Sequence, residues 1–351
     1  MIETYGWRVA SGLDFAPFAA RGLRPGRVIL QQRGHCTLAT DFGELAAGLA
    51  GRLLHDGADP PVAGDWVACA CRPAEGAATI HAVLPRRTCF TRQRPGGQGV
   101  QVVAANIDVA LLATSMNAEF NPRRLERYLA AAWASGARPV VVLTKADLCS
   151  ASAPILAAAQ AVAIGVEVLA VSAATGTGLD RLAALLRPRE TCAVLGSSGV
   201  GKSSLVNALA GQALMATGDI READARGRHT TTHRELLVLP GGRLVLDTPG
   251  MRELGLAEAA EGVAATFEDI AALAADCRFH DCAHASEPGC AVQAALAAGA
   301  LDPGRWKSYQ KLQRELAHAT ARGDQAARAA QHKRWVALTK SQRAARKFRQ
   351  L

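Results

Sequence analysis

The chain has 351 residues, of which 49% are hydrophobic and 20% are charged, and its formal net charge is +9. This length allows two or three domains with sizeable cores. No run of 18 apolar residues is free of charges or helix breakers, which excludes a transmembrane helix, and the first residues lack the basic and apolar regions of a signal peptide. We therefore expect a cytoplasmic protein without a membrane partner.

Residues 27–90 have the pattern of a small β-barrel. Short apolar runs separated by Gly, Pro and Asp turns lie at residues 27–30, 36–40, 65–71 and 78–84. Five short strands in roughly 70 residues are typical of such a barrel. A polar, Gly-rich segment at residues 92–99 indicates a linker after it.

Beyond the linker, apolar strands alternate with helical stretches. The strands are predicted at residues 107–113, 139–143, 167–171, 192–195 and 244–246, and the helices begin near residues 123, 154, 179 and 201. This alternation predicts a mostly parallel sheet with helices on both faces. After residue 255 the chain is Ala-rich and helical, and from residue 303 onward it is also basic.

We predict three domains. An N-terminal extension and the barrel occupy residues 1–98, an α/β domain occupies 99–258, and a helical metal-binding domain with a basic tail occupies 259–351. The positive charge lies in that tail, because residues 305–351 carry 13 Lys or Arg and 2 Asp or Glu, while the rest of the chain sums to −2. Such tails bind nucleic acid or anionic membranes, and the alternative is a solvated helical face.

A phosphate loop is predicted at residues 196–203. The segment fits G-x-x-x-x-G-K-[ST], follows the predicted strand at 192–195 and opens a helix at Gly201. Its glycines let backbone N–H groups converge on a β-phosphate, Lys202 places a charge between the β- and γ-phosphates, and Ser203 offers a hydroxyl to Mg²⁺. The predicted nucleotide contacts of this segment are Gly196, Ser197, Ser198, Gly199, Val200, Gly201, Lys202, Ser203 and Ser204.

A base-selecting motif, Thr144-Lys145-Ala146-Asp147, follows the strand predicted at residues 139–143. The Asp147 carboxylate can accept both N1–H and N2–H of guanine, a pair of donors that adenine lacks. The stem of Lys145 can lie over the purine. Thr144 stands where many GTPases carry Asn, and this difference removes an amide that braces the loop.

The order of these motifs is unusual. The base motif precedes the phosphate loop, Ser172-Ala173 lies between them with a backbone N–H for the guanine oxygen, and Asp247-Thr-Pro-Gly250 comes last. In an ordinary GTPase the phosphate loop leads, so this order indicates a circularly permuted P-loop GTPase domain. Permutation places the segment that responds to the γ-phosphate directly before the C-terminal region.

The remaining nucleotide contacts are expected in two loops. Asp247 at a strand end would hold Mg²⁺, and Gly250 can turn its N–H toward a γ-phosphate. Residues 211–234 form a long polar stretch of the kind that a switch loop needs, in which the hydroxyl of Thr231, or alternatively Thr230, would join Mg²⁺. The alternative is that the same residues form a disordered surface loop that does not respond to nucleotide.

Position 251 bears on catalysis. A water-positioning Gln often follows the Asp-x-x-Gly motif, but here the residue is Met251, which cannot orient water. Intrinsic hydrolysis should therefore be slow, on the order of 10⁻⁴ to 10⁻² per second. His229 is the nearest polar candidate in the sequence and would act with Lys202 and Thr231. The alternative is that His229 is only a solvated residue of the switch loop.

A second cluster carries metal-ligand chemistry. Cys277, Cys282, His284 and Cys290 offer three thiolates and one imidazole within 14 residues. A closed Cys₃His set is typical of structural Zn²⁺, so we expect one structural zinc ion per chain. His280 could replace His284 as the fourth ligand, and reduced cysteines in a small helical core are the alternative to a metal.

Taken together, these motifs resemble the RsgA family of circularly permuted GTPases that depend on the small ribosomal subunit. The resemblance covers nearly everything from about Gly26. It rests on residues 61–66 (Pro-Val-Ala-Gly-Asp-Trp), 105–108 (Ala-Asn-Ile-Asp), 227–232 (Gly-Arg-His-Thr-Thr-Thr), 247–256 and the Cys/His cluster. Residues 1–25 and the length of the basic tail depart from the family pattern.

The resemblance implies an N-terminal OB-fold, a permuted GTPase domain and a C-terminal zinc domain. It implies a protein that binds the 30S ribosomal subunit and acts late in small-subunit maturation. We expect a monomer whose partners are GTP and GDP, the 30S subunit and its 16S rRNA. GTP would promote 30S binding, and the ribosome would stimulate hydrolysis to GDP and phosphate. The resemblance also supports His229 as the catalytic group.

Two hypotheses from different classes stay open on the residues alone. The chain is either a ribosome-activated GTPase or a binding module that uses GTP only as a ligand, and turnover with and without 30S particles separates the two. A membrane-surface GTPase is disfavoured because the basic tail has no apolar anchoring face and the chain has no lipidation motif.

Overall fold

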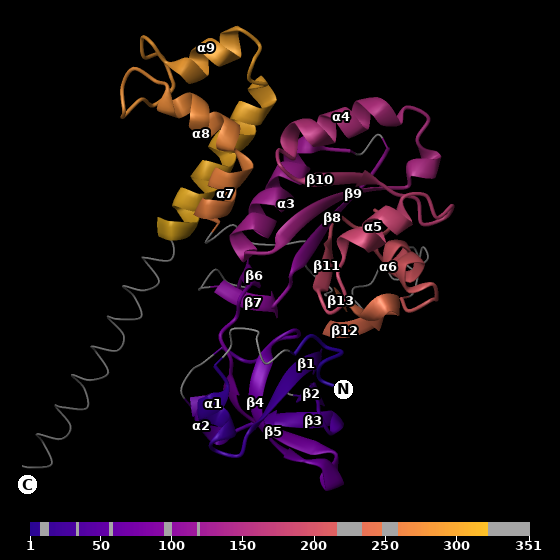
Figure 1. Cartoon of the computed structure of the whole chain (residues 1–351). Helices are drawn as coiled ribbons and strands as arrows, with labels where there is room; N and C mark the ends of the chain where they lie inside the picture. Colours follow the sequence, from indigo (N-terminus) through magenta and orange to yellow (C-terminus); the bar gives the residue numbers. More distant parts are fainter. Residues whose placement is uncertain are drawn as a thin grey trace, which may run out of the picture.

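The computed structural model describes residues 1–7, 14–32, 35–55, 59–94, 100–117, 120–215, 234–247 and 259–321, apart from the side chains at positions 54, 55, 93 and 247. Three parts follow one another along an elongated molecule. A barrel lies at one end, an α/β domain lies in the middle and a helical region lies at the other end (Figure 1).

The N-terminal part is a closed barrel of five strands. They pair in the order β1-β2-β3-β5-β4, and β4 pairs back with β1 to close the ring. Its interior is filled by Val28, Leu38, Val67 and Ile80, none of which is exposed. The OB-fold class expected for this part is confirmed. The elements are α1 (Ala16–Ala19), β1 (Arg24–Gln32), β2 (His35–Thr40), β3 (Gly43–Leu49), α2 (Gly51–His55), β4 (Trp66–Arg72), η1 (Pro73–Glu75) and β5 (Ala77–Val83).

A hairpin joins the barrel to the α/β domain. Its strands β6 (Cys89–Gln93) and β7 (Val100–Ala105) are antiparallel, with Arg92 opposite Gln101 and Gln93 opposite Val100. The start of the predicted linker at residues 92–99 is therefore strand, because the β6–β7 pairing extends to Gln93. The boundary proposed between residues 98 and 99 falls between two strands that pair with each other.

The central sheet has the strand order β10-β9-β8-β11-β13-β12, and only the β12–β13 pair in it is antiparallel. Strands such as β8 are apolar along their length because helices cover both faces of the sheet. This is the parallel α/β architecture predicted from the alternating pattern. The strands are β8 (Val109–Ser115), β9 (Arg138–Thr144), β10 (Glu167–Ala170), β11 (Thr191–Leu195), β12 (Arg234–Leu239) and β13 (Arg243–Asp247).

Helices lie on both faces, in two separate cores. On one face α3 and α4 pack through Leu125, Leu129 and Val162. On the other face α5 and α6 pack through Leu182 and Leu205. All four helices begin within two residues of the predicted positions. Their bounds are α3 (Pro122–Ser135), α4 (Ser152–Val162), α5 (Leu179–Leu185) and α6 (Lys202–Ala210), and the short turns are η2 (Ala146–Leu148) and η3 (Pro240–Gly242).

The C-terminal region docks on α3. It comprises α7 (Ala260–Thr266), α8 (Glu268–Ala275), α9 (Ala291–Ala297) and a helix at residues 303–321. Helix α7 crosses α3 so closely that a Cβ on Gly262 would lie 2.1 Å from the carbonyl oxygen of Ala130. Beside this crossing, the guanidinium of Arg305 pairs with Glu126 at 3.1 Å, and both side chains are almost completely buried.

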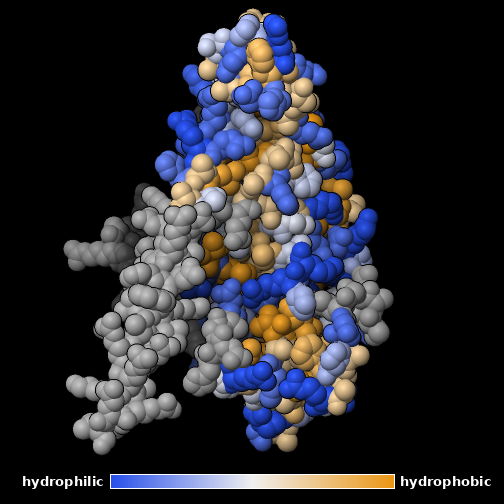
Figure 2. Space-filling view, turned by 90° about the vertical axis from the view of Figure 1, so that its left-hand side faces the viewer, coloured by the Kyte–Doolittle hydropathy of each residue, from blue (hydrophilic) through white to orange (hydrophobic). Residues whose placement is uncertain are grey.

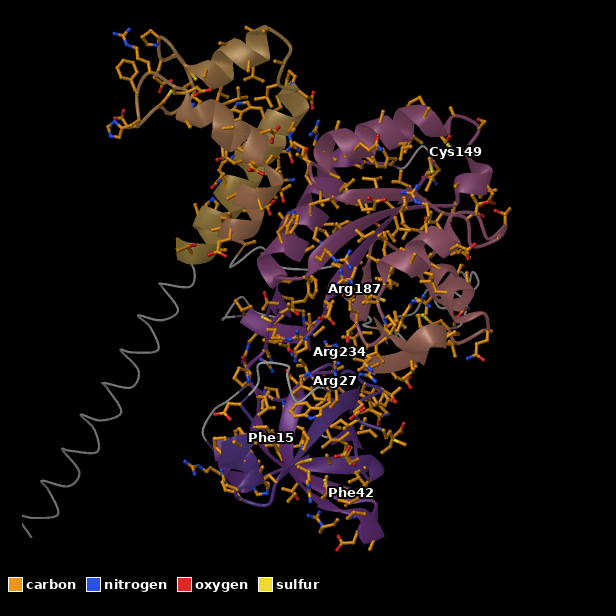
Figure 3. The ribbon with its side chains drawn as sticks, in the orientation of Figure 1. Phe15, Arg27, Phe42, Cys149, Arg187 and Arg234 are labelled. Carbon is orange, nitrogen blue, oxygen red and sulfur yellow. The ribbon has the colours of Figure 1, made fainter. Side chains whose placement is uncertain are left out.

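The barrel and the α/β domain share backbone hydrogen bonds. Strand β1 also pairs with β12, with Leu30 opposite Glu235 and Gln31 opposite Arg234, so the two sheets form one continuous sheet of 11 strands. Arg234 adds a side-chain hydrogen bond to Gln31 at 3.0 Å. Figure 3 labels Arg27, which lies on β1, and Arg234, which lies on β12, the two strands that meet at this joint.

The surface of the described residues is mixed in character. On the face shown in Figure 2, hydrophilic side chains separate the hydrophobic areas from one another. Among the described residues, none of the helices combines the length and the apolar character that crossing a bilayer requires.

Gly64 provides a test of the contact between the barrel and the end of β7. A Cβ at Gly64 would lie 2.1 Å from the carbonyl oxygen of Ala105, whereas a Cβ at Gly76 would meet nothing within 4 Å, although both glycines have positive φ, at +90° and +63°. We predict that Gly76→Ala lowers the free energy of unfolding by about 1 kcal/mol through backbone strain alone. Gly64→Ala should lower it by roughly 1–3 kcal/mol more, because the added methyl overpacks the contact with Ala105. Urea unfolding of both variants measures this difference, and equal losses would contradict the close approach.

Candidate nucleotide and metal sites

The phosphate loop wraps around the ammonium of Lys202. It connects β11 to α6, and Gly199 and Gly201 have φ of 77° and 92°, a region that favours glycine. Lys202 Nζ donates to the carbonyl oxygens of Gly196 at 3.0 Å and Ser197 at 2.6 Å. The loop thus has the curled shape that directs backbone N–H groups and the start of α6 toward an anion.

The base motif is tied to the phosphate loop through Thr144. Thr144 ends β9 and is only 4% exposed, and its hydroxyl donates to the carbonyl oxygen of Val200 at 2.5 Å. Thr144 lacks the amide of Asn, but its hydroxyl reaches the phosphate loop itself. Lys145 has a left-handed φ of 58°, and its Cε lies 3.9 Å from the position of a Cβ on Gly201.

Asp147 is oriented by a buried serine. The hydroxyl of Ser172 donates to Oδ1 of Asp147 at 2.5 Å and accepts the N–H of Thr175 at 3.1 Å. The N–H of Ser172 is donated to the carbonyl oxygen of Thr177, which leaves the N–H of Ala173 as the candidate donor for a base oxygen. Sequence reasoning assigned Ser172 a backbone role, whereas the structure gives its side chain the task of orienting the carboxylate.

The structure therefore brings together three of the predicted segments. The Thr144–Val200 and Ser172–Asp147 hydrogen bonds connect the base motif to the phosphate loop and to the segment after β10. The backbone of Asp247 ends β13, which runs parallel to β11 with Leu246 opposite Ala193. The side chain of Asp247 lies outside the described part of the chain. So do the remaining predicted residues, which are His229, Thr230, Thr231, Gly250 and Met251.

Two further side chains contact the phosphate loop and were not predicted. From α3, Arg124 Nη1 donates to the hydroxyl of Ser197 at 3.0 Å, and the hydroxyl of Tyr128 lies 3.3 Å from the same atom. Their spacing of four residues places them on one side of the helix, which the sequence could have indicated. The identity of their partner depends on how α3 packs beside β11.

The Cys/His cluster forms as predicted. The ligand atoms of Cys277, Cys282, His284 and Cys290 all lie within 4.8 Å of one another. His284 Nδ1 lies 3.5 Å from the sulfur atoms of both Cys277 and Cys290. The side chain of His280 is 99% exposed and lies apart from this set, so the structure selects His284. Three thiols and one imidazole converging on a point are the donor set of a metal site.

Groups around the cluster hold its ligands in place. Cys290 precedes α9, and its sulfur accepts the N–H of Gln293 at 3.4 Å. The Gln293 side chain donates to the carbonyl oxygen of His284 at 2.6 Å, and the His284 ring meets Trp306 edge-on at 5.8 Å. Such surrounding contacts orient the first ligands of metal sites.

Comparison with known proteins gives a consistent result. The family model described as RsgA GTPase matches residues 83–257. The protein named small ribosomal subunit biogenesis GTPase RsgA in Opitutus terrae is 49% identical over 98% of this chain and 97% of its own length. Its namesake in Streptomyces coelicolor is 48% identical over 93% of this chain and 90% of its own length.

Solved structures show the same architecture. YjeQ from Thermotoga maritima aligns with a TM-score of 0.63 and 26% identity, covering 84% of this chain and 99% of its own. YloQ, whose structure is described as that of a circularly permuted GTPase, shares the fold with a TM-score of 0.59. The chain carries the phosphate loop with the base motif before it, and it is 48–49% identical to two RsgA proteins over at least 93% of its length. It therefore belongs to the RsgA GTPase family.

Proposed function

We propose that this chain hydrolyses GTP to GDP and phosphate, that the 30S ribosomal subunit stimulates this hydrolysis, and that the cycle serves late maturation of the small subunit. The observation that carries the proposal is the hydrogen bond between Thr144 and Val200, because it holds a guanine-reading motif against a formed phosphate loop. The names of the relatives support the ribosomal role.

The described residues would act mainly on binding and orientation. Lys202 would place its charge between the β- and γ-phosphates, while the loop N–H groups hold the β-phosphate. Hydrolysis joins a water oxygen to the γ-phosphorus and breaks its bond to the β–γ bridging oxygen. His229 is proposed to position the attacking water, and Thr231 is proposed to contact the metal ion. Mg²⁺ would neutralise phosphate charge, held by Ser203, Thr231 and Asp247.

Guanine selection would follow from the orientation of Asp147. The hydroxyl of Ser172 occupies Oδ1, so the carboxylate is held in one orientation before the base arrives. A preorganised acceptor loses little conformational freedom on binding, and it rejects bases that lack paired donors.

We propose that the metal of the Cys/His cluster is one structural Zn²⁺. Four protein ligands complete a tetrahedral site and leave no open position for catalysis. Zinc bound there would stabilise a region whose two flanking helices, α8 and α9, share few buried apolar side chains.

The proposed partners are the 30S subunit with its 16S rRNA, met by the barrel and by the basic residues at the C-terminus. The tail after residue 321 lies outside the described residues, so its contribution rests on its charge alone. We also propose that the chain works as a monomer in the cytoplasm, with the three domains bounded near residues 98 and 258.

Asp147→Asn should exchange base preference. The amide donates where the carboxylate accepted, so we predict that affinity moves from GTP toward XTP by at least about tenfold. Competition binding with both nucleotides measures this change, and Asp180→Asn, an acidic residue at the start of α5, is the control. Unchanged GTP and XTP affinities would rule out Asp147 as the residue that reads the base.

Turnover with and without purified 30S particles tests the activity itself. Lys202→Ala should abolish hydrolysis, because the charge between the β- and γ-phosphates is lost. His229→Ala should keep GTP affinity within a few-fold but lose the 30S-stimulated rate by roughly 10²-fold or more. If 30S-stimulated turnover survived in Lys202→Ala, the assignment of the phosphate loop would be refuted. If it survived only in His229→Ala, a group other than His229 would have to position the water.

Metal analysis tests the zinc site. We predict about one zinc ion per chain after reducing purification, and loss of that ion in Cys282→Ser, with earlier proteolysis of the region after residue 259. Cys149→Ser, which removes a free thiol far from the cluster, should keep the metal. Zinc retained at full stoichiometry in Cys282→Ser would contradict the assignment.

A further inference from the structure

Residues 1–7, the N-terminal turn, lie across the joint between the barrel and the α/β domain. The N–H groups of Thr4, Tyr5 and Gly6 each donate to the carbonyl oxygen three residues earlier, at 3.0–3.1 Å, so the segment is closed on itself. Sequence reasoning placed these residues in an N-terminal extension and gave them no role. Their contacts reach both of the parts that meet at the joint.

On the barrel side, the N-terminal turn packs into an apolar cluster outside the barrel interior. Ile2 is only 1% exposed and shares this cluster with Trp66 of β4 and with Leu84, which follows β5. Trp66 alternates along β4 with Val67, which belongs to the interior cluster. The rings of Trp7 and Trp66 lie 5.0 Å apart, centroid to centroid. Burial of these large apolar side chains attaches the turn to the barrel.

On the other side, Gly6 lies against the α/β domain. A Cβ on Gly6 would lie 3.0 Å from the carbonyl oxygen of Arg189, two residues before β11, and 4.0 Å from Cδ1 of Leu244 in β13. The φ of Gly6 is +93°, a value that favours glycine. Glu3 adds an ion pair with Arg189 at 4.0 Å, which contributes little because both side chains are exposed. Close backbone approach is therefore the main contact on this side.

The guanidinium of Arg27 connects the two contacts. Its Nη1 donates to the carbonyl oxygen of Tyr5 at 2.6 Å, and its Nη2 donates to the hydroxyl of Thr191 at 2.9 Å. One buried side chain of the barrel thus bonds to the N-terminal turn and to β11 at once. Direct strand pairing across the joint is short, because β1 and β12 pair over only two residues each in the described part of the chain.

We propose that the N-terminal turn is a strap that fastens the barrel to the α/β domain, and that without it the two parts open more readily about the β1–β12 pair. The strap is the end of the chain, so it can detach without straining another segment. Leu38 in the barrel and Leu205 in the α/β domain belong to separate cores, which would remain intact when the joint opens. The strap thereby fixes the barrel relative to the strand that leads into the phosphate loop.

Hydrogen–deuterium exchange of the full chain and of a chain lacking residues 2–7 tests the strap. We expect the amides that bond β1 to β12 to exchange at least about tenfold faster in the shortened chain, because local opening of the joint costs less free energy. Amides in the β8–β9 pair, within the α/β sheet, should exchange at an unchanged rate. Unchanged exchange across β1–β12 would overturn the proposal, and so would equal acceleration in both places, which is general destabilisation.

Two glycine variants test the same contact without removing any apolar side chain. Gly6→Ala should also accelerate exchange across β1–β12, because its methyl group would collide with the carbonyl oxygen of Arg189. Gly22→Ala is the matched control, since Gly22 also has a positive φ, of +75°, but a Cβ there would meet nothing within 4 Å. It should leave the joint unchanged. The same exchange rates across β1–β12 in the two variants would show that the contact with Arg189 does not fasten the joint.

Discussion

The guanidinium of Arg27 joins the parts of the molecule on which the nucleotide site is built. It comes from β1 of the barrel, is buried, and donates to Thr191, the first residue of β11, at 2.9 Å, and to the carbonyl oxygens of Tyr5 and Asn106. It also lies 4.7 Å from the ring of Trp66. Burial lowers the pKa of Arg27 to about 10, so the guanidinium stays charged at neutral pH. Removing its hydrogen-bond partners would therefore leave a buried charge without compensation.

This contact matters for the site because β11 leads directly into the phosphate loop. Strand β1 pairs with β12, and β12 begins at Arg234, immediately after the segment that contains His229 and Thr231. The barrel is therefore hydrogen-bonded to β12, which follows the segment of His229 and Thr231, and to β11, which precedes the phosphate loop. The first of these links consists of the backbone hydrogen bonds between β1 and β12, and the second is the side-chain hydrogen bond from Arg27 to Thr191.

Helix α3 plays the corresponding role toward the C-terminal region. Arg124 and Tyr128 face the phosphate loop, while Glu126 pairs with Arg305 beneath the crossing with α7. Burial raises the pKa of Glu126, and the neighbouring Arg123 and Arg305 oppose that shift. Helix α3 thus connects the C-terminal region to the loop that would hold the phosphates.

The local chemistry was determined by the sequence alone. The phosphate loop, the base motif and the Cys/His spacing are contiguous, and the strand and helix periods are local, so each could be identified without a fold. Only the tertiary structure decided the partners: Thr144 with Val200, Ser172 with Asp147, Arg124 with Ser197, and β1 with β12. Hydroxyls, guanidinium groups and strand backbones can bond to many groups, and the packing of distant segments determines which of those groups they reach.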